Sequence, residues 1–245
     1  MVLLPFVDLD PELTALRPLG GFFLLRATGA PACPPPTLAE TYGPRTSDVY
    51  ENSMTFRVRK VASSLNAPEL RIAASVAQQG LAARLWSVAL GCAVRYGTLP
   101  DLSPELLRWD PDAGAPDDLW LTEVRPSTDD LVDAVLHAHL EPLASLVRER
   151  YRVAEGLLWG NAASALAGAA RQLHRWAREQ GRADDAVRTR ELTSGLLAHP
   201  RLAGALDANL RRRSCCLYYR VPGGGVCGDC CFTRPPGPSP RAASG

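Results

Sequence analysis

The sequence predicts an α+β protein that is mostly helical, with a small antiparallel sheet and a cysteine-rich C-terminal segment. Residues 68–96 place apolar residues at helical spacing, and the alanine-rich stretch 153–180 is predicted as a second long helix that ends at Gly181. Short strand-like pieces fill residues 93–126. Five of the seven cysteines lie after residue 210. A chain of 245 residues with 46% apolar and 22% charged residues can bury a sizeable core in one or two domains.

The N-terminal segment, residues 1–46, is predicted to hold little regular structure. A short helix is expected after Pro11 and a strand at 21–26. A loop is expected at 29–36, where clustered prolines oppose both helix formation and sheet pairing. Cys33 lies alone in this loop, and no ligand role is expected for it.

The next stretch, residues 47–66, alternates polar and apolar residues and allows two interpretations. A solvated face is the default for surface charge and is favoured. The alternative is a basic pocket wall that contacts an anionic or oxygen-rich ligand, with Lys60, the only lysine, as a candidate contact. The polar residues are Ser47, Arg57, Arg59, Lys60, Ser63, Ser64 and Asn66.

A long helix is predicted over 68–96, because Pro68 suits a first helical turn and apolar residues recur at helical spacing. Its polar residues Gln78, Gln79 and Arg84 are candidates to point into a site. Cys92 falls on the apolar stripe and is expected in the core. The apolar residues of the stripe are Ile72, Val76, Leu81, Leu85, Val88 and Cys92.

Residues 93–126 are expected to form a small antiparallel meander from pieces at 94–100, 106–109 and 118–124, with Trp109 and Trp120 as packing residues.

Ser127 and Asp130 form a capping signature ahead of a helix over 129–151, which Pro142 should kink or split. His137 and His139, two residues apart, point to different faces and cannot form a metal-binding pair at i, i+4 spacing.

The helix predicted over 153–180 is rich in alanine and contains Gly160 and Asn161 near its start. Glycine and asparagine cost helix stability, so a packing or functional reason is expected. Close helix packing at Gly160 and a ligand contact by Asn161 both stay open. Further helices are predicted over 184–197 and 200–210.

The cysteine-rich segment has the spacing Cys-Cys, ten residues, Cys, two residues, Cys, formed by Cys215, Cys216, Cys227 and Cys230. A Cys-x-x-Cys turn lets two thiolates converge on one metal ion. The intervening loop is expected to start as a strand over 217–221 and then to reverse at Pro222 and three glycines.

Three chemistries compete for this spacing. Structural zinc commonly uses two Cys-x₂₋₄-Cys knuckles, and only one is present here. A disulfide framework suits short secreted chains, which this is not. A [2Fe–2S] cluster relaxes the geometry of an adjacent cysteine pair, since each iron takes two of the four thiolates. The spacing favours iron–sulfur and leaves zinc open.

The ending resembles that of the FhuF-like ferric siderophore reductases, which hold a [2Fe–2S] cluster. The segment 158–166, Leu-Trp-Gly-Asn-Ala-Ala-Ser-Ala-Leu, is similar to the family's internal Trp-Gly-Asn segment, and the resemblance extends from about Ser47 to Phe232. It implies Cys215, Cys216, Cys227 and Cys230 as the cluster ligands. Cys231 adjoins Cys230 and could compete with it as a ligand, but the matching spacing favours Cys230, and Cys231 is expected to be a buried or spare thiol.

The resemblance implies transfer of one electron from the cluster to siderophore-bound Fe(III), which releases Fe(II). No Gly-x-Gly-x-x-Gly follows a strand and no P-loop is present, so an external donor, a ferredoxin or a flavin reductase, is expected. The alternative is a non-catalytic iron–sulfur or zinc module that senses redox state. Arg211, Arg212, Arg213 and Arg220 are expected to favour the reduced cluster, or else to form a solvated basic patch or a docking site for an acidic electron donor. Among all residues, Arg213, Arg220, Asn161 and Lys60 are the candidates for substrate contact or tuning of the cluster.

Composition and the N-terminal sequence limit the partners and the cellular location that can be expected. A net charge near +1 argues against a nucleic-acid partner, and no apolar run reaches the roughly 18 residues of a membrane helix. The N-terminus lacks the features of a signal peptide. A cytoplasmic protein is expected, either free or peripheral at the inner face of the membrane.

The predicted organisation has four parts. They are an N-terminal segment with a proline-rich loop (1–46), an α+β body (47–210), an iron–sulfur segment (211–233) and a disordered tail (234–245).

Overall fold

The computed structural model describes residues 8–27, 33–43 and 52–236. The predicted disordered tail therefore lies outside the described residues from 237 onward, as do Ser47 and the first part of the proline-rich loop.

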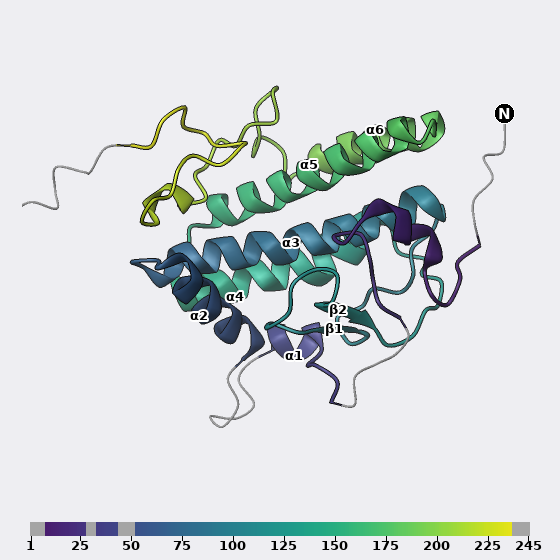
Figure 1. Cartoon of the computed structure of the whole chain (residues 1–245), viewed down its shortest axis with the longest axis horizontal. Helices are drawn as coiled ribbons and strands as arrows, with labels where there is room; N and C mark the ends of the chain where they lie inside the picture. The colour runs from purple at the N-terminus through teal and green to yellow at the C-terminus, as the bar shows by residue number, and fades with distance from the viewer. Residues whose placement is uncertain (1–7, 28–32, 44–51, 237–245) are drawn as a thin grey trace, which may run out of the picture.

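The described chain is built on two long helices that pack against each other, α3 (Leu70–Arg95) and α5 (Glu155–Glu179). Around this pair lie α2 (Ser53–Leu65), α4 (Glu141–Tyr151) and α6 (Ala183–Leu197), as Figure 1 shows. The short elements are a 3₁₀ helix η1 (Thr14–Leu19), α1 (Leu38–Tyr42), a π-helix η2 (Val132–Leu140) and a 3₁₀ turn η3 (Tyr218–Arg220).

The sheet has two antiparallel strands, β1 (Leu107–Trp109) and β2 (Leu119–Leu121), with Leu107 opposite Leu121. The α+β class with a small antiparallel sheet is confirmed. Trp109 is buried as predicted, and Arg26 lies over the ring of the less buried Trp120.

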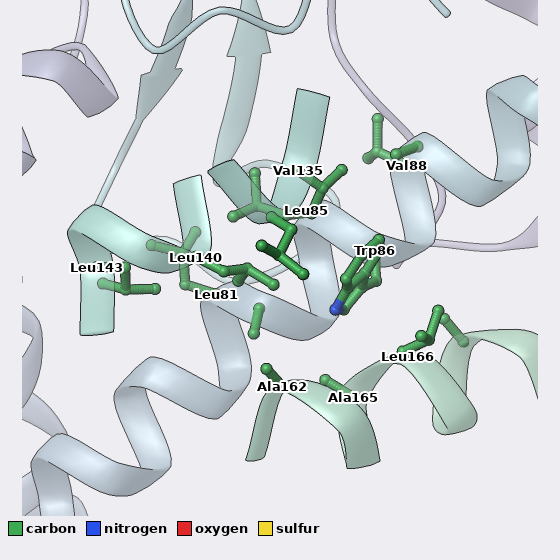
Figure 2. Packing of buried hydrophobic residues seen from close by; sticks show 14 of the residues in the cluster. Leu81, Leu85, Trp86, Val88, Val135, Leu140, Leu143, Ala162, Ala165 and Leu166 are labelled. Carbon is green, nitrogen blue, oxygen red and sulfur yellow. The ribbon is translucent and has the colours of Figure 1, made fainter. Parts of the chain in front are cut away.

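One hydrophobic core joins these elements (Figure 2). Trp86 of α3 is fully buried, and small residues on α5 let the two helices approach closely. Side chains of η2 and α4 cover the other side of α3. The residues labelled in Figure 2 are Leu81, Leu85, Trp86, Val88, Val135, Leu140, Leu143, Ala162, Ala165 and Leu166.

Both long helices are confirmed. The kink or split expected at Pro142 is not seen, because the helix is continuous from 131 to 151 and only its hydrogen bonding changes, from π to α, next to Pro142. The π-helix ends where the N–H of Glu141 donates to the carbonyl of Leu136, five residues back, and Pro142 lies in the first turn of α4. Proline has no N–H, so it makes no backbone donation at the position where the hydrogen bonding changes from π to α.

The strand predicted at 21–26 is wrong; only Arg26 pairs there, in a single bridge to Trp120. The buried guanidinium of Arg84 accounts for this, because it donates to the carbonyls of Phe22 and Leu24 and so removes acceptors that a strand needs. Arg84 also pairs with buried Asp118 at 2.8 Å. The predicted meander likewise reduces to two strands, since 94–95 still belong to α3.

The helix predicted over 200–210 is also wrong, and turns occupy this stretch. Gly204 and Leu210 have φ angles of 75° and 58°, which a right-handed helix cannot hold. The carboxylate of Asp207 accepts from the N–H groups of Asn209 and Arg211 and closes a local turn instead.

His139 is fully buried and has both ring nitrogens satisfied. Its Nε2–H donates to the carbonyl of Leu102 at 2.7 Å, so Nδ1 accepts from the hydroxyl of Tyr42 at 3.0 Å. Burial lowers the pKa of His139 from 6.5 to about 4. His139 is thus a neutral core residue and not a metal ligand.

This predicts a pH-dependent stability. The unfolded chain binds a proton at His139 below pH 6.5 and the native chain does not, so the stabilisation is complete above pH 6.5 and is lost as the pH falls towards 4. Between pH 7.5 and 5.5 the contribution falls by about 1.4 kcal/mol. Urea unfolding at both pH values should show a smaller loss in His139→Gln, whereas a variant of the exposed His137, His137→Gln, should behave as wild type. Equal losses in wild type and His139→Gln would contradict this account.

Candidate metal-cluster site

The cysteine segment lies over the first half of α5, close to the start of α3 (Figure 1). Ser75 of α3 donates its hydroxyl to the carbonyl of Cys216 at 2.9 Å. From the segment itself, Ser214 donates to the carbonyl of Gly156 on α5 at 3.1 Å. The segment is therefore fixed to both central helices.

Gly160 is the point of closest approach. A Cβ at this position would clash with the hydroxyl of Ser214. The packing reason predicted for glycine inside this helix is thus confirmed, since the bare backbone lets the cysteine segment lie directly on α5.

The loop between the cysteine pairs is a turn and not the predicted strand over 217–221. Leu217 has a φ of 70°, and the N–H groups of Arg220 and Val221 donate three residues back. A Cβ on Gly224 would lie 2.5 Å from the carbonyl oxygen of Tyr218, so the tight return of this loop requires glycine.

All seven cysteines are free thiols, and five of them gather in this segment. The sulfurs of Cys216 and Cys227 lie 3.7 Å apart. Cys231 lies in hydrogen-bonding contact with both Cys215 and Cys230. By contrast, Cys33 is exposed in its loop and Cys92 is buried in the core, as predicted.

Backbone N–H groups point at two of the sulfurs. Leu217 donates to the sulfur of Cys215 at 3.2 Å, and Phe232 donates to that of Cys230 at 3.4 Å. Such bonds stabilise charge on sulfur and tune a bound metal centre.

Raised pKa values keep Cys215 and Cys227 protonated at neutral pH in the metal-free chain. Burial is the main reason that the pKa of Cys215 rises to about 11, and the neighbouring thiols add to it. Burial, Cys216 and Asp229 raise the pKa of Cys227 well above its usual range. Several thiolates together need a compensating cation, so metal binding here releases protons.

One pair of these thiols has the separation that binding to a shared metal ion requires. Within residues 8–27, 33–43 and 52–236, no three Cys, His, Asp or Glu side chains converge on one ion. Thiolates bound at about 2.3 Å to one tetrahedral ion lie about 3.8 Å apart, close to the separation of Cys216 and Cys227. A two-iron cluster needs two such pairs, because each iron takes two of the four thiolates.

A buried ion pair lies beneath the cysteines. The fully buried guanidinium of Arg212 pairs with Asp229, inside the Cys-x-x-Cys turn, at 2.9 Å. It also donates to Ser164 at 2.7 Å and to the side-chain oxygen of Asn161. Burial alone would raise the pKa of Asp229, but the bonds from Ser164 and Arg212 lower it, so the carboxylate stays charged.

Asn161 links this ion pair to α3. We call the hydrogen-bonded set of Arg212, Asp229, Ser164, Asn161, Ser75 and Gln78 the Arg212 network. The amide nitrogen of Asn161 donates to the carbonyl and hydroxyl of Ser75 and to the side-chain oxygen of Gln78 at 2.9–3.0 Å. Gln78 in turn donates to the carbonyl of Leu158. Asn161 is fully buried, so it positions the cysteine segment on α3 and α5.

The other sequence candidates lie at the surface. Arg213 is exposed beside the cysteines, and Arg220 pairs with Glu69 at 2.9 Å, which offsets part of its charge. Lys60 is bound by the side chain and carbonyl of Asp112. The sequence placed Arg212 with Arg211, Arg213 and Arg220 as basic residues near the cluster. It did not predict the burial of Arg212 or its ion pair with Asp229, because the neighbouring arginines give the same signal.

This fold and its thiols define an iron–sulfur protein. Residues 212–232 match the model of the FhuF 2Fe-2S C-terminal domain, so the cofactor is a [2Fe–2S] cluster. Residues 71–215 match the model described as ferric iron reductase FhuF-like transporter. The chain belongs to this FhuF-like ferric iron reductase family. No curated protein matches the chain significantly.

Among the described helices, none is long and apolar enough to span a bilayer.

The Arg212 network predicts that Arg212 fixes the cluster segment. Replacing Arg212 by Gln leaves Asp229 charged and unpaired, which should lower the unfolding free energy by about 3 kcal/mol. Urea unfolding followed by the visible absorption of the cluster should therefore show earlier cluster loss. Arg213→Gln is the matched control, because it removes the same charge one residue away at an exposed position. Equal midpoints for the two variants would show that the network does not fix the segment.

Proposed function

We propose that this ferric reductase acts on siderophores, delivering one electron to chelated Fe(III) and releasing Fe(II). The observation that carries the proposal is the gathering of free thiols over the first half of α5, within the segment that matches the family's cluster domain. A bound [2Fe–2S] cluster supplies electrons one at a time, as this reaction requires.

Cys215, Cys216, Cys227 and Cys230 are the proposed ligands. The separation of 3.7 Å between the sulfurs of Cys216 and Cys227 supports these two on one iron, which leaves Cys215 and Cys230 for the other. Cys231, though in contact with two of these thiols, is proposed to stay unligated.

Reduction releases the metal because Fe(III) and Fe(II) differ in their affinity for the oxygen donors of a siderophore. Siderophores bind Fe(III) through hard oxygen donors and hold Fe(II) far less well. One electron converts Fe(III) to Fe(II), which leaves while the chelator stays intact. Clusters with four thiolates work near −400 mV in plant-type ferredoxins, low enough to attempt such reductions.

The basic residues of the segment favour the more negative, reduced state. Arg212 is buried and offset by Asp229, whereas Arg213 is exposed and Arg220 is exposed beside Glu69. Guanidinium groups stay protonated, so each stabilises an added negative charge to the degree that solvent and partners leave it unscreened.

The electron comes from a separate protein, a ferredoxin or a flavin reductase, because no nucleotide-binding motif is present in the sequence. Seven free thiols suit a reducing compartment, and we propose the cytoplasm, including the inner face of the membrane.

The ligand assignment predicts the outcome of cysteine replacement. Purified wild type should be red-brown, with close to two irons and two sulfides per chain. Ser in place of Cys215, Cys216, Cys227 or Cys230 should abolish or deform the cluster, whereas Cys33→Ser, Cys92→Ala and Cys231→Ser should retain it. Iron and sulfide analysis with visible spectra checks this. Loss of the cluster in Cys231→Ser would overturn the assignment, and a colourless chain with one zinc would overturn the cofactor.

The proposed reaction predicts single-turnover iron release. Protein reduced with dithionite and desalted anaerobically should release about one Fe(II) per cluster from a ferric siderophore, measured with a ferrous-selective chromogenic chelator. Cys227→Ser, treated in the same way, is the control for residual reductant. If the reduced cluster stays reduced beside the chelate and no Fe(II) appears, the protein is a redox-sensing module instead.

A further inference from the structure

A basic groove lies between α5 and α6, on a part of the molecule that the cluster site does not use. Its volume is about 830 Å³, within the range of small-ligand sites. Alanine and leucine side chains form its apolar part, and charged side chains surround them. The lining residues are Ala167, Ala170, Arg171, His174, Arg175, Arg178, Glu179, Thr189, Arg190, Thr193, Ser194, Leu197 and Leu210.

The charge of this groove is concentrated and of one sign. Four arginines and one glutamate give it a net charge of +3 with His174 neutral, although the whole chain carries only +1. All four arginines are exposed, and within the described residues none of them makes an ion pair. Their charge is therefore available to a ligand.

The arginines are arranged by helical spacing. Arg171, Arg175 and Arg178 recur three and four residues apart and so share one face of α5, while Arg190 faces them from α6. A stripe of guanidinium groups above an apolar floor suits a ligand with an organic skeleton and several negative charges.

The groove adjoins the cysteine segment. Leu210, which lines one end, directly precedes that segment. Ala167 lies one helical turn beyond Ser164, whose hydroxyl contacts Asp229 in the Cys-x-x-Cys turn. Arg171 lies about 10 Å along α5 from Ser164. A ligand in this groove is thus close to the cluster ligands without touching them.

We propose that this groove binds the ferric substrate and selects chelates with net negative charge, such as a tris-catecholate of Fe(III) with charge −3. The inference rests on the proposed siderophore reductase function. Charge complementarity carries it, since +3 in the groove meets −3 on the chelate. A docked donor protein would bury about 800 Å² of surface per partner, whereas this is a hollow of small-molecule size.

The test is binding to oxidised holoprotein, so that no electron transfer is involved. Quenching of tryptophan fluorescence would report the affinity of two chelates, a trianionic ferric tris-catecholate and an uncharged ferric tris-hydroxamate. The wild type should bind the tris-catecholate at least tenfold more tightly at low salt, and added salt should reduce this preference. The double variant Arg171→Gln with Arg175→Gln should lose most of the preference for the tris-catecholate, because each substitution removes one positive charge from the groove.

Arg148→Gln is the matched control, because Arg148 is an exposed arginine on α4 outside the groove. Equal affinity for both chelates, or a preference that the groove variants leave unchanged, would overturn the inference. If the oxidised protein binds the tris-catecholate selectively but the dithionite-reduced protein releases no Fe(II) from it, the proposed reduction is contradicted and the groove is not, so the two failures are distinguishable.

Discussion

The ion pair between Arg212 and Asp229 is the interaction on which the cluster site depends. The guanidinium has no exposed surface, so the charge is tolerated only because Asp229, Ser164 and Asn161 all bind it. These partners lie 17, 48 and 51 residues away in the chain. One side chain therefore joins the Cys-x-x-Cys turn to α5, and through Asn161 to α3.

The two central helices provide the rigid base that this arrangement needs. Small residues on α5 let α3 approach closely, and Gly160 lets the cysteine segment lie against the helix itself. The same helix continues past the cluster segment into the basic groove, so one element positions both the thiols and the proposed substrate site. A shift of α5 would alter both at once.

The sequence was most informative where a local pattern determines the outcome. Apolar spacing predicted α3, the alanine-rich composition predicted α5, and the cysteine spacing predicted the segment that matches the cluster domain. It failed where distant groups compete for the backbone. Arg84 takes the carbonyls of 22–24 and prevents a strand, and Asp207 closes a turn where a helix was predicted. Arg212 could not be told from Arg211 and Arg213, because its partners come from α5 and the Cys-x-x-Cys turn.

The most direct test of the account is whether the ferric chelate binds beside the cluster. Chromium(III) tris-catecholate is a paramagnetic analogue that exchanges its ligands slowly and resists reduction. Bound in the groove, it should accelerate the electron-spin relaxation of the reduced cluster, and Arg171→Gln with Arg175→Gln should abolish this effect. If the wild-type protein binds the chromium analogue as tightly as it binds the ferric tris-catecholate, but the spin relaxation of its reduced cluster is unchanged, the substrate binds elsewhere. The account of α5 as the shared support of cluster and substrate would then be wrong.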